Sequence, residues 1–516
     1  MTPPRISKFG TIAALFVLGT TLGMGSAAAI ADDVEVLTRG PVHEAFAGTV
    51  TFNPVPGVVV TRECPAPIAE SPPDLKPEGA NVSWIPGYWA WDDERNGFLW
   101  ISGIWRDLPH GRQWVPGYWT VCESGYQWTP GYWASASLTE VEYLPEPPQT
   151  VEVTPTEAAP SADHVWMPGI WLWRHGHFVW RPGFWAVVEA GWSWIPDHYV
   201  WSSRGCIFVN GYWDYSLARR GTLFAPVCFT PNIVAQTAFV YSPTIVIGLD
   251  NFVDHLFLRP NYCHYYFGDY YAVAYDRAGF YPCFAFHEHH GYDPIFVHER
   301  WEHRRDREWE HRVAFDFRNR REHVELRPPR TFALQQSLVA SGRSANRNLI
   351  VAAPLRQVAA SKSGSMRFLP VSHVEAKHFA TLGAKIQETR HERQTHESKV
   401  KTRVPPAEAT RSLHTERSIT KPLDRAAPHS PGREPQVSLV NKARLPQSPI
   451  VSSAPAHLGH AYVPPKAHTP PKPDLKIEAK PGKVGSSELR PSQRGPSRQI
   501  NPVHKPGVIG DDHKKV

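Results

Sequence analysis

A six-residue phrase, repeated eight times, dominates the middle of this 516-residue chain. The phrase is Trp-x-Pro-Gly-aromatic-Trp, and its first copy is WIPGYW at residues 84–89. The copies begin at Trp84, Trp100, Trp114, Trp128, Trp166, Trp180, Trp194 and Phe208. One step of 16 residues is followed by steps of 14, with a longer gap between the fourth and fifth copies. A fixed period indicates a repeat architecture, so this array constrains the fold more than any other feature.

Each repeat unit has the composition of a β-strand bounded by turns. Aromatic residues favour strands, and polar segments with glycine, such as residues 92–97 and 108–111, favour tight turns. We therefore predict a mainly β protein in which each unit of about 14 residues supplies one strand of an antiparallel meander. The units form two four-unit blocks, residues 84–133 and 166–213, and four strands are enough for a stable sheet.

The Pro-Gly step inside each unit needs an explanation, because proline cannot donate a hydrogen bond to a sheet ladder. One possibility is a β-bulge, which leaves one residue unpaired and bends the strand. The other is a type II turn with Pro-Gly at its centre, which doubles the number of strands and shortens them. We favour the bulge, because the polar segments already supply one turn per period.

Side-chain alternation puts aromatic rings on both faces of these strands. Trp128 and Tyr132 share one face, and Trp133 lies on the other with Gly131, where a neighbouring tryptophan can fill the gap. Eighteen of the 20 tryptophans lie in the array, too many to be exposed together, so we expect most in the core. Rings left uncovered are candidates for stacking on sugars or peptides, or for cation–π contacts. The candidate binding residues are Trp89, Trp105, Trp119, Trp133, Trp171, Trp185 and Trp213.

The hexapeptides resemble the WXXGXW repeat of tryptophan-rich secreted bacterial proteins of the planctomycete type. The resemblance covers both repeat blocks, and residues 35–83 and 221–300 look like the flanks of that group. Ser102, Asp197 and Asn210 depart from the pattern, so their units are weaker members. The resemblance implies a secreted protein without an established activity, and it assigns no functional residue.

The N-terminus predicts export. Residues 1–31 combine Arg5 and Lys8 with an apolar centre at 12–22 and the small-residue cleavage site Ala29-Ile30-Ala31. The alternative is an uncleaved membrane anchor, but the apolar centre is shorter than the ~20 residues that a span needs. We expect a secreted, periplasmic or cell-envelope protein, without a transmembrane span after cleavage.

Six cysteines in an exported chain permit disulfides. Cys206–Cys228 and Cys263–Cys283 are the local pairings, although fifteen pairings exist and free buried cysteines are equally compatible with the sequence. The spacings match no metal or redox signature. Sequence alone leaves the pairing open, and it leaves the oligomeric state open as well.

The remaining segments differ in composition, and each predicts a different kind of structure. Residues 297–325 predict one charged helix with an apolar stripe through Trp301 and Trp309. Residues 331–516 are rich in proline, with 30 Lys and Arg against 13 Asp and Glu, which predicts a mostly disordered basic tail with short helices around Val374 to Arg393 at most. The other segments are an N-terminal segment and linker at 32–83, a Pro/Glu/Thr-rich linker at 134–165 and a Tyr/Phe-rich extension at 221–296.

Catalytic motifs are incomplete in this chain. HEHHG at residues 287–291 has glycine where the zinc-protease helix needs its second histidine. We therefore predict a non-catalytic protein without a cofactor, a structural or interaction module for an envelope polysaccharide or protein. Export argues against nucleic acid as a partner of the basic tail. The alternative is a metal protein or hydrolase with its site in residues 260–311, built from His264, His287, His289, His290, His298, His303 and His311.

Overall fold

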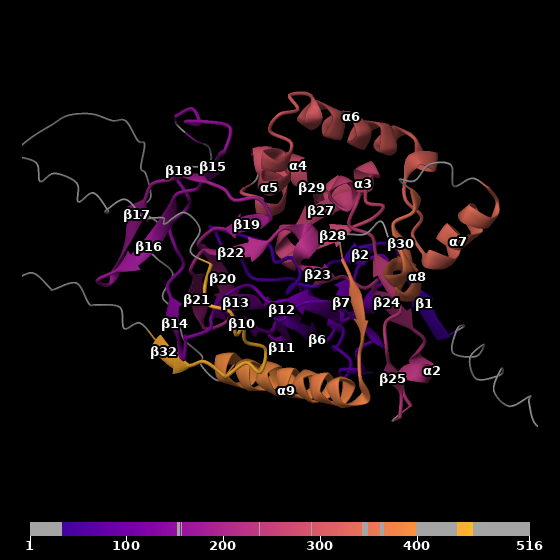
Figure 1. Ribbon diagram of the computed structural model, residues 1–516. Helices are drawn as coiled ribbons and strands as arrows, with labels where there is room; N and C mark the ends of the chain where they lie inside the picture. Colours follow the sequence, from indigo (N-terminus) through magenta and orange to yellow (C-terminus); the bar gives the residue numbers. More distant parts are fainter. Residues whose placement is uncertain are drawn as a thin grey trace, which may run out of the picture. The chain divides into compact units, whose positions relative to one another are not determined.

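The computed structural model describes residues 33–151, 155, 157–236, 238–289, 291–342, 349–361, 366–398 and 441–457 (Figure 1). Antiparallel strands are the main element of this part of the chain, which confirms the mainly β prediction. The predicted signal segment at 1–31 lies outside the described residues, as do residues 399–440 and 458–516 of the predicted tail.

Two successive repeat units form one long β-hairpin. In the first hairpin β7 (Tyr88–Asp92) pairs with β8 (Gly97–Ile101), and β6 (Val82–Ile85) pairs with β9 (Ile104–Asp107). Each arm is interrupted for two residues, at Pro86-Gly87 in one arm and at Ser102-Gly103 in the other. The hairpin therefore has an inner pair of strands next to the turn and an outer pair beyond the two interruptions.

The interruption is neither a bulge nor a turn. Ile85 faces Ile104 on one side of it and Tyr88 faces Ile101 on the other, so both arms carry the same number of residues across it. A bulge would add an unmatched residue, and a turn would pair β6 with β7. The bulge that we favoured is wrong. The turn that we considered as the alternative does not form either, although its consequence holds, since the Pro-Gly step divides each unit into two shorter strands. Proline is tolerated there because the interruption needs no ladder hydrogen bond.

The same arrangement recurs three times, and we call the four structures hairpins 1 to 4. Hairpin 2 consists of β10 (Arg112–Val115), β11 (Tyr118–Cys122), β12 (Gly125–Thr129) and β13 (Tyr132–Ser135). Hairpin 3 consists of β15 (His164–Met167), β16 (Ile170–Arg174), β17 (His177–Arg181) and β18 (Phe184–Val187). Hairpin 4 consists of β19 (Trp192–Ile195), β20 (His198–Ser202), β21 (Gly205–Val209) and β22 (Tyr212–Tyr215).

Strands from outside the array pair with edges of hairpins 1, 2 and 4. Within the described residues no hairpin pairs with another, so the predicted one-strand-per-unit meander is wrong. Open edges invite further pairing, and here strands of the same chain provide it. The partners are β24 (Val227–Phe229) on β8, β23 (Gly221–Thr222) on β9, β3 (Val59–Val60) on β12, and β14 (Glu140–Leu144) on β21, with β1 (Val34–Val36) beyond β24 and β32 (Asn441–Arg444) beyond β14.

The Tyr/Phe-rich extension shares the core of the first repeat block. Its sheet has the order β2 (Gly40–Pro41), β28 (His264–Phe267), β27 (Leu256–Arg259), β29 (Tyr281–Pro282). Tyr265 and Phe296 are buried in one cluster with Ile85 and Trp133. Smaller elements complete this region: α2 (Pro231–Val234), α3 (Val273–Arg277), α4 (Cys283–His289), β4 (Ala69–Glu70) with β25 (Val240–Tyr241), β26 (Ile245–Ile247) with β30 (Ala352–Pro354), and β5 (Leu75–Pro77) with β31 (Phe368–Pro370).

The charged segment forms two helices instead of the single helix that we predicted. α5 (Pro294–Glu302) begins at Asp293, whose carboxylate accepts hydrogen bonds from the N–H groups of Ile295 and Phe296. α6 (Trp309–Glu322) follows after a short loop. Trp309 stacks on Phe296 of α5, with ring centroids 5.6 Å apart. The chain folds back because this ring contact buries more of Trp309 than one continuous, solvated helix would.

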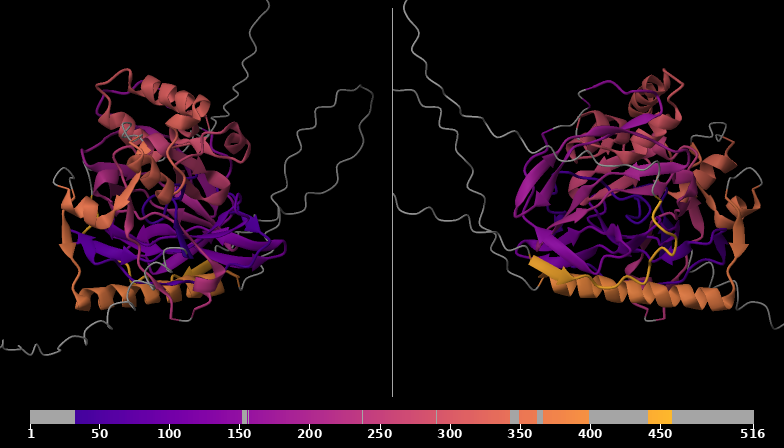
Figure 2. Two further views of the ribbon diagram at one scale, coloured as in Figure 1. Left: turned by 90° about the vertical axis from the view of Figure 1, so that its right-hand side faces the viewer. Right: turned by 60° about the vertical axis from the view of Figure 1, so that its left-hand side comes forward.

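The first part of the predicted tail is folded, which corrects the expectation of disorder from residue 331. It contains α7 (Phe332–Ala340), α8 (Leu355–Ala360) and the 26-residue α9 (His373–Ser398). Figures 1 and 2 show α9, in orange, alongside strands of the first repeat block. Phe379, Leu382 and Ile386 form its apolar stripe, and the Phe379 ring meets Trp105 at 4.9 Å. None of the described helices is long and apolar enough to cross a membrane.

The folded state of α9 predicts its resistance to protease. Trypsin should leave residues 373–398 uncut in the native full-length chain, although Lys377, Lys385 and Arg393 are potential sites, because the helix is packed on the hairpins. Mass spectrometry of a digestion time course checks this, with the urea-unfolded chain as the control. Cleavage at these sites at the rate of the unfolded chain would contradict the packing of α9.

Candidate functional site

Hairpins 1 to 3 each have two directly opposed tryptophan pairs, one on either side of the interruption, whereas hairpin 4 has one such pair and Tyr199 opposite Phe208. In hairpin 1 Trp84 faces Trp105 and Trp89 faces Trp100, with ring centroids 5.2 Å apart in both pairs. The rings meet edge to face, which is a favoured geometry for aromatic pairs. The other pairs are Trp114–Trp133, Trp119–Trp128, Trp166–Trp185, Trp171–Trp180 and Trp194–Trp213. Tryptophan pairing is thus the common internal structure of the repeat.

The glycine of each unit makes room for a tryptophan of the unit it pairs with. A Cβ on Gly87 would lie 2.6 Å from Trp100 Nε1, and a Cβ on Gly131 would lie 2.7 Å from the Trp114 ring. The gap that the sequence indicated at Gly131 is therefore filled by Trp114. Hairpin 4 departs from the pattern at two paired positions, with Asp197 in place of glycine and Phe208 in place of tryptophan. The two departures compensate, because the smaller ring needs less of the space.

Most of the seven candidate binding tryptophans lie in the core. Trp89, Trp105, Trp133 and Trp213 are buried, with Trp105 completely inaccessible. Trp119, Trp171 and Trp185 are half-buried. In the first block Trp119 is the single tryptophan that is not buried, whereas in the second block only Trp166 and Trp213 are. The accessible rings are therefore concentrated in the second block.

Buried or half-buried carboxylates hold the N–H side of the interruptions. In hairpin 1 Glu70 accepts hydrogen bonds from the N–H of Gly87 (2.7 Å), the N–H of Gly103 (2.9 Å) and Nε1 of Trp100 (3.1 Å). In hairpin 4 Asp197, the residue that replaces glycine, accepts from the N–H of Gly211. Burial raises the pKa of Glu70 to about 7, against the hydrogen bonds that lower it. The interrupted strands leave these N–H groups unpaired, and a carboxylate satisfies them.

Hairpin 2 repeats this arrangement with a carboxylate from the N-terminal segment. Glu44 accepts from the N–H of Gly131 (2.9 Å) and from Trp128 Nε1 (3.0 Å). Burial raises its pKa to about 8. The indole that donates to Glu44 belongs to the same repeat position as Trp100 in hairpin 1. The repeat thus presents a glycine N–H and an indole N–H side by side as a receptor for one carboxylate.

Helix α9 holds the carbonyl side of the interruption in hairpin 2. Arg393 donates to the carbonyl oxygens of Pro116 (3.0 Å) and Pro130 (2.8 Å), one from each arm. Its guanidinium is also paired with Glu397, and Glu397 accepts a hydrogen bond from Tyr118. Arg393 and Glu397 are almost completely buried. The two charges compensate each other while they fix α9 on the hairpin.

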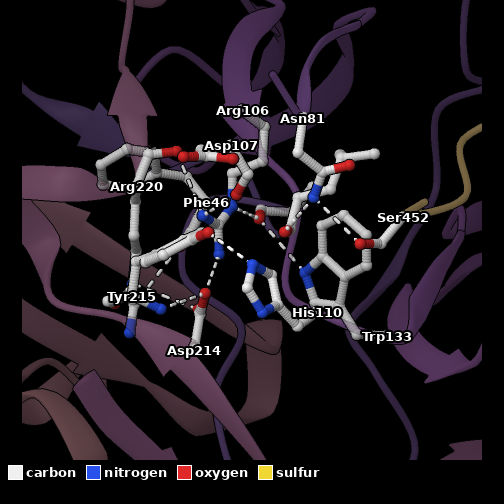
Figure 3. Close-up of polar contacts among 12 residues, drawn as sticks. Phe46, Asn81, Arg106, Asp107, His110, Trp133, Asp214, Tyr215, Arg220 and Ser452 are labelled. Carbon is white, nitrogen blue, oxygen red and sulfur yellow. Dashed lines mark hydrogen bonds and ion pairs between the residues drawn. The ribbon is translucent and has the colours of Figure 1, made fainter. Parts of the chain in front are cut away.

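A buried cluster of charges connects the two repeat blocks (Figure 3). Asp214 of hairpin 4 is paired with Arg106 of hairpin 1 and with Arg220, and all three are at most 3% exposed. Arg220 also donates to the Phe46 carbonyl oxygen at 3.0 Å, and Arg106 donates to that of Ala45 at 2.9 Å. Two guanidinium groups thus share one carboxylate and bind the N-terminal segment.

A cavity of about 390 Å³ lies between hairpins 2 and 4 and the extension. The segment at residues 48–55 passes along it, and the Tyr199 N–H donates to the Thr51 carbonyl oxygen. Asp214 and Arg220 line the cavity and are paired with each other. Aromatic rings form part of its walls, among them those of Trp114, Tyr132, Trp133, Tyr199, Trp201 and Tyr292.

The histidines of the alternative, a metal site in residues 260–311, are not brought together. His287 contacts the ring of Tyr292, and burial lowers its pKa to about 3. His264 lies elsewhere, beside Tyr88 and Trp128. In the described part of the chain no three His, Cys, Asp or Glu side chains are placed to hold a metal ion, and His290 lies outside that part. The geometry of the described residues thus gives the alternative no support.

None of the six cysteines is bonded to another. Cys206 is buried in a cluster with Ile170 and Tyr199, whereas Cys228 packs against the cluster around Leu37. The pairing Cys206–Cys228 therefore does not form, and neither does Cys263–Cys283. The cysteines are free and pack as small apolar side chains, which is the second of the two possibilities that the sequence left open.

Comparisons with known proteins agree with the structural repeat. No curated protein and no solved structure matches the chain. A family model described as WXXGXW repeat (2 copies) matches residues 79–106, 95–120, 124–137 and 162–186. The first and last of these matches coincide with hairpins 1 and 3, so two copies of the sequence repeat correspond to one hairpin. Residues 79–120, 124–137 and 162–186 of this chain are WXXGXW repeats.

Proposed function

We propose that this chain is an exported, non-catalytic protein of the bacterial cell envelope, in which the aromatic hairpins form a scaffold and hairpin 3 binds envelope polysaccharide. The uneven exposure of the tryptophans carries the proposal. Hairpin 3 has four half-buried tryptophans, Trp171, Trp173, Trp180 and Trp185, whereas every tryptophan of hairpin 1 is buried. Hairpin 3 therefore keeps aromatic surface that the core does not use.

The chemistry of hairpin 3 suits a sugar polymer. Half-exposed indoles offer flat apolar surface on which the C–H faces of sugar rings stack. Trp171 and Trp180 form one pair at 5.3 Å, and Trp173 meets Phe178 at 4.8 Å. The turn between β16 and β17 is polar, with His175 and His177, and supplies hydrogen-bonding groups beside the rings.

The non-catalytic part of the proposal is supported by the use of the buried carboxylates. Glu44, Glu70 and Asp214 are engaged with glycine N–H groups, indoles or guanidinium groups, where they hold the fold together. Export is supported by the predicted signal segment at residues 1–31, and placement in the envelope rests on the resemblance to secreted tryptophan-rich proteins.

The test is retention of the purified full-length chain on insoluble envelope polysaccharide. We expect retention of the native chain, and a loss of most of it in the double variant Trp171→Ala, Trp185→Ala. Trp309→Ala is the matched control, because Trp309 is a half-buried tryptophan outside the array. Circular dichroism verifies that the variants are folded. Equal retention of the double variant and the control would refute hairpin 3 as the binding surface. If the chain is retained on immobilised envelope proteins and not on the polysaccharide, the partner is a protein.

A further inference from the structure

A second cavity, of about 300 Å³, lies where α9 crosses hairpins 1 and 2. The segment at residues 64–67 closes one side, and α9 closes another with Gln387, Arg390, His391 and Gln394. Trp119 is half-buried at this cavity, whereas Trp89 beside it is buried. The remaining walls are the rings of Tyr88, Trp89, Trp100, Tyr118, Trp119 and Trp128.

Arg390 brings a positive charge into this aromatic cavity without a carboxylate partner. Its Nε donates to the Gly117 carbonyl oxygen (2.9 Å) and its Nη1 donates to Gln387, both of which are neutral acceptors. No ion pair of Arg390 exists among the described residues, and its Nη2 has no hydrogen-bond partner there. Arg393, one turn further along the helix, is instead paired with Glu397. Arg390 is therefore the uncompensated charge of this helix face.

The surroundings of Arg390 do not supply the missing negative charge. Burial lowers the pKa of its guanidinium to about 10, although Tyr88, Cys64 and Glu44 act in the opposite direction. Glu44 is directed at hairpin 2, where its two carboxylate oxygens accept hydrogen bonds from Trp128 Nε1 (3.0 Å) and from the N–H of Gly131 (2.9 Å). Arg390 is half-buried, and a partly desolvated charge is stabilised by a partner of opposite sign. The cavity thus favours an anion at Arg390.

We propose that this cavity binds a sugar acid, with the ligand carboxylate on Arg390 and the sugar ring against the tryptophans. A guanidinium binds a carboxylate through two parallel N–H···O bonds, and Nη2 is available for one of them. The indoles of Trp89 and Trp119, both among the tryptophans that the sequence marks as candidates, form the apolar wall. Gln387 and His391 provide polar groups for ligand hydroxyls. The site belongs to the first block and does not depend on the proposed role of hairpin 3.

The test is calorimetric titration of the full chain with glucuronate, glucose and acetate. We expect saturable binding of glucuronate, and at least about tenfold weaker binding of glucose, which lacks the charge, and of acetate, which lacks the ring. Arg390→Gln should weaken glucuronate binding about tenfold or more, and Arg390→Lys should weaken it less. Lys385→Gln is the matched control, since it removes an exposed positive charge from the same helix.

Several outcomes would overturn the proposal. Absence of saturable glucuronate binding refutes the site, and equal binding of glucose refutes the role of the charge. Equal binding of acetate refutes the role of the aromatic wall. If the melting curve shows that Arg390→Gln unfolds the chain, Arg390→Lys takes its place in the test. A folded lysine variant that binds glucuronate like the Lys385→Gln control shows that the guanidinium is not the anchor.

Discussion

Replacing Asp214 by asparagine should lower the free energy of unfolding by about 3–5 kcal/mol. Asp214 is the single carboxylate paired with Arg106 and Arg220, and all three side chains are buried. Asparagine keeps the shape but removes the charge, which leaves two guanidinium groups in the core without compensation. Breaking a buried pair is costly for this reason, even where the pair itself adds little to stability. Urea denaturation followed by far-ultraviolet circular dichroism measures the change.

Two further variants separate the charge effect from a general loss of packing. Asp306→Asn breaks an exposed pair with Arg312 and should leave stability nearly unchanged, because solvent screens exposed pairs. Adding Arg220→Met to Asp214→Asn should recover part of the lost stability, because it removes one of the two uncompensated charges. An Asp214→Asn variant as stable as the Asp306→Asn control would show that the cluster does not hold the two repeat blocks together.

The sequence predicts the units of this fold well and their connections poorly. The period, the turn residues and the need for a tryptophan over Gly131 follow from local composition and side-chain alternation. Pairing does not, because Trp84–Trp105 and Trp89–Trp100 depend on which strands meet. The paired departures at Asp197 and Phe208 are the one signal that was available. Together they indicate that consecutive units fold as one hairpin. In the sequence alone the two departures look unrelated, because the pairing that links them is not known.

The groups that hold the candidate sites together come from distant parts of the chain. Glu44 and Glu70 lie in segments without a repeat, and a lone glutamate in an apolar or proline-rich stretch is the only signal that they give. The sequence indicated only short helices around Val374 to Arg393, and not the 26-residue packed helix α9, because the apolar stripe is diluted by the basic, proline-rich composition of residues 331–516. Its Arg390 and Arg393 therefore resemble the other charges of the tail, although Arg390 lines a cavity and Arg393 is paired with Glu397 inside the protein.

Stability should be greatest close to pH 6.5, because two sets of buried groups oppose each other. Burial lowers the pKa of His43 and His287 to about 3 and that of His198 and His264 to about 4. These histidines are neutral in the folded chain but gain a proton near pH 6.5 when it unfolds, so their contribution is lost as the pH falls from 6.5 towards 4. Thermal melting between pH 4 and 9 should show this acid limb.

The alkaline limb of the same profile should come from the carboxylates that hold the interruptions. Glu70 and Glu44 have folded pKa values of about 7 and about 8, above their ordinary value of 4.5. The folded state therefore binds their protons more tightly, and stability falls as the pH rises from 4.5 through these values. For Glu70 the loss is of the order of 3 kcal/mol.

Glu70→Gln should flatten this limb, since glutamine still accepts a glycine N–H but does not titrate, whereas exposed Glu123→Gln should follow the native profile. An alkaline limb that is unchanged in Glu70→Gln would contradict the position of this carboxylate. Glu70 would then not accept the hydrogen bonds of the Gly87 and Gly103 N–H groups that hold the interruption.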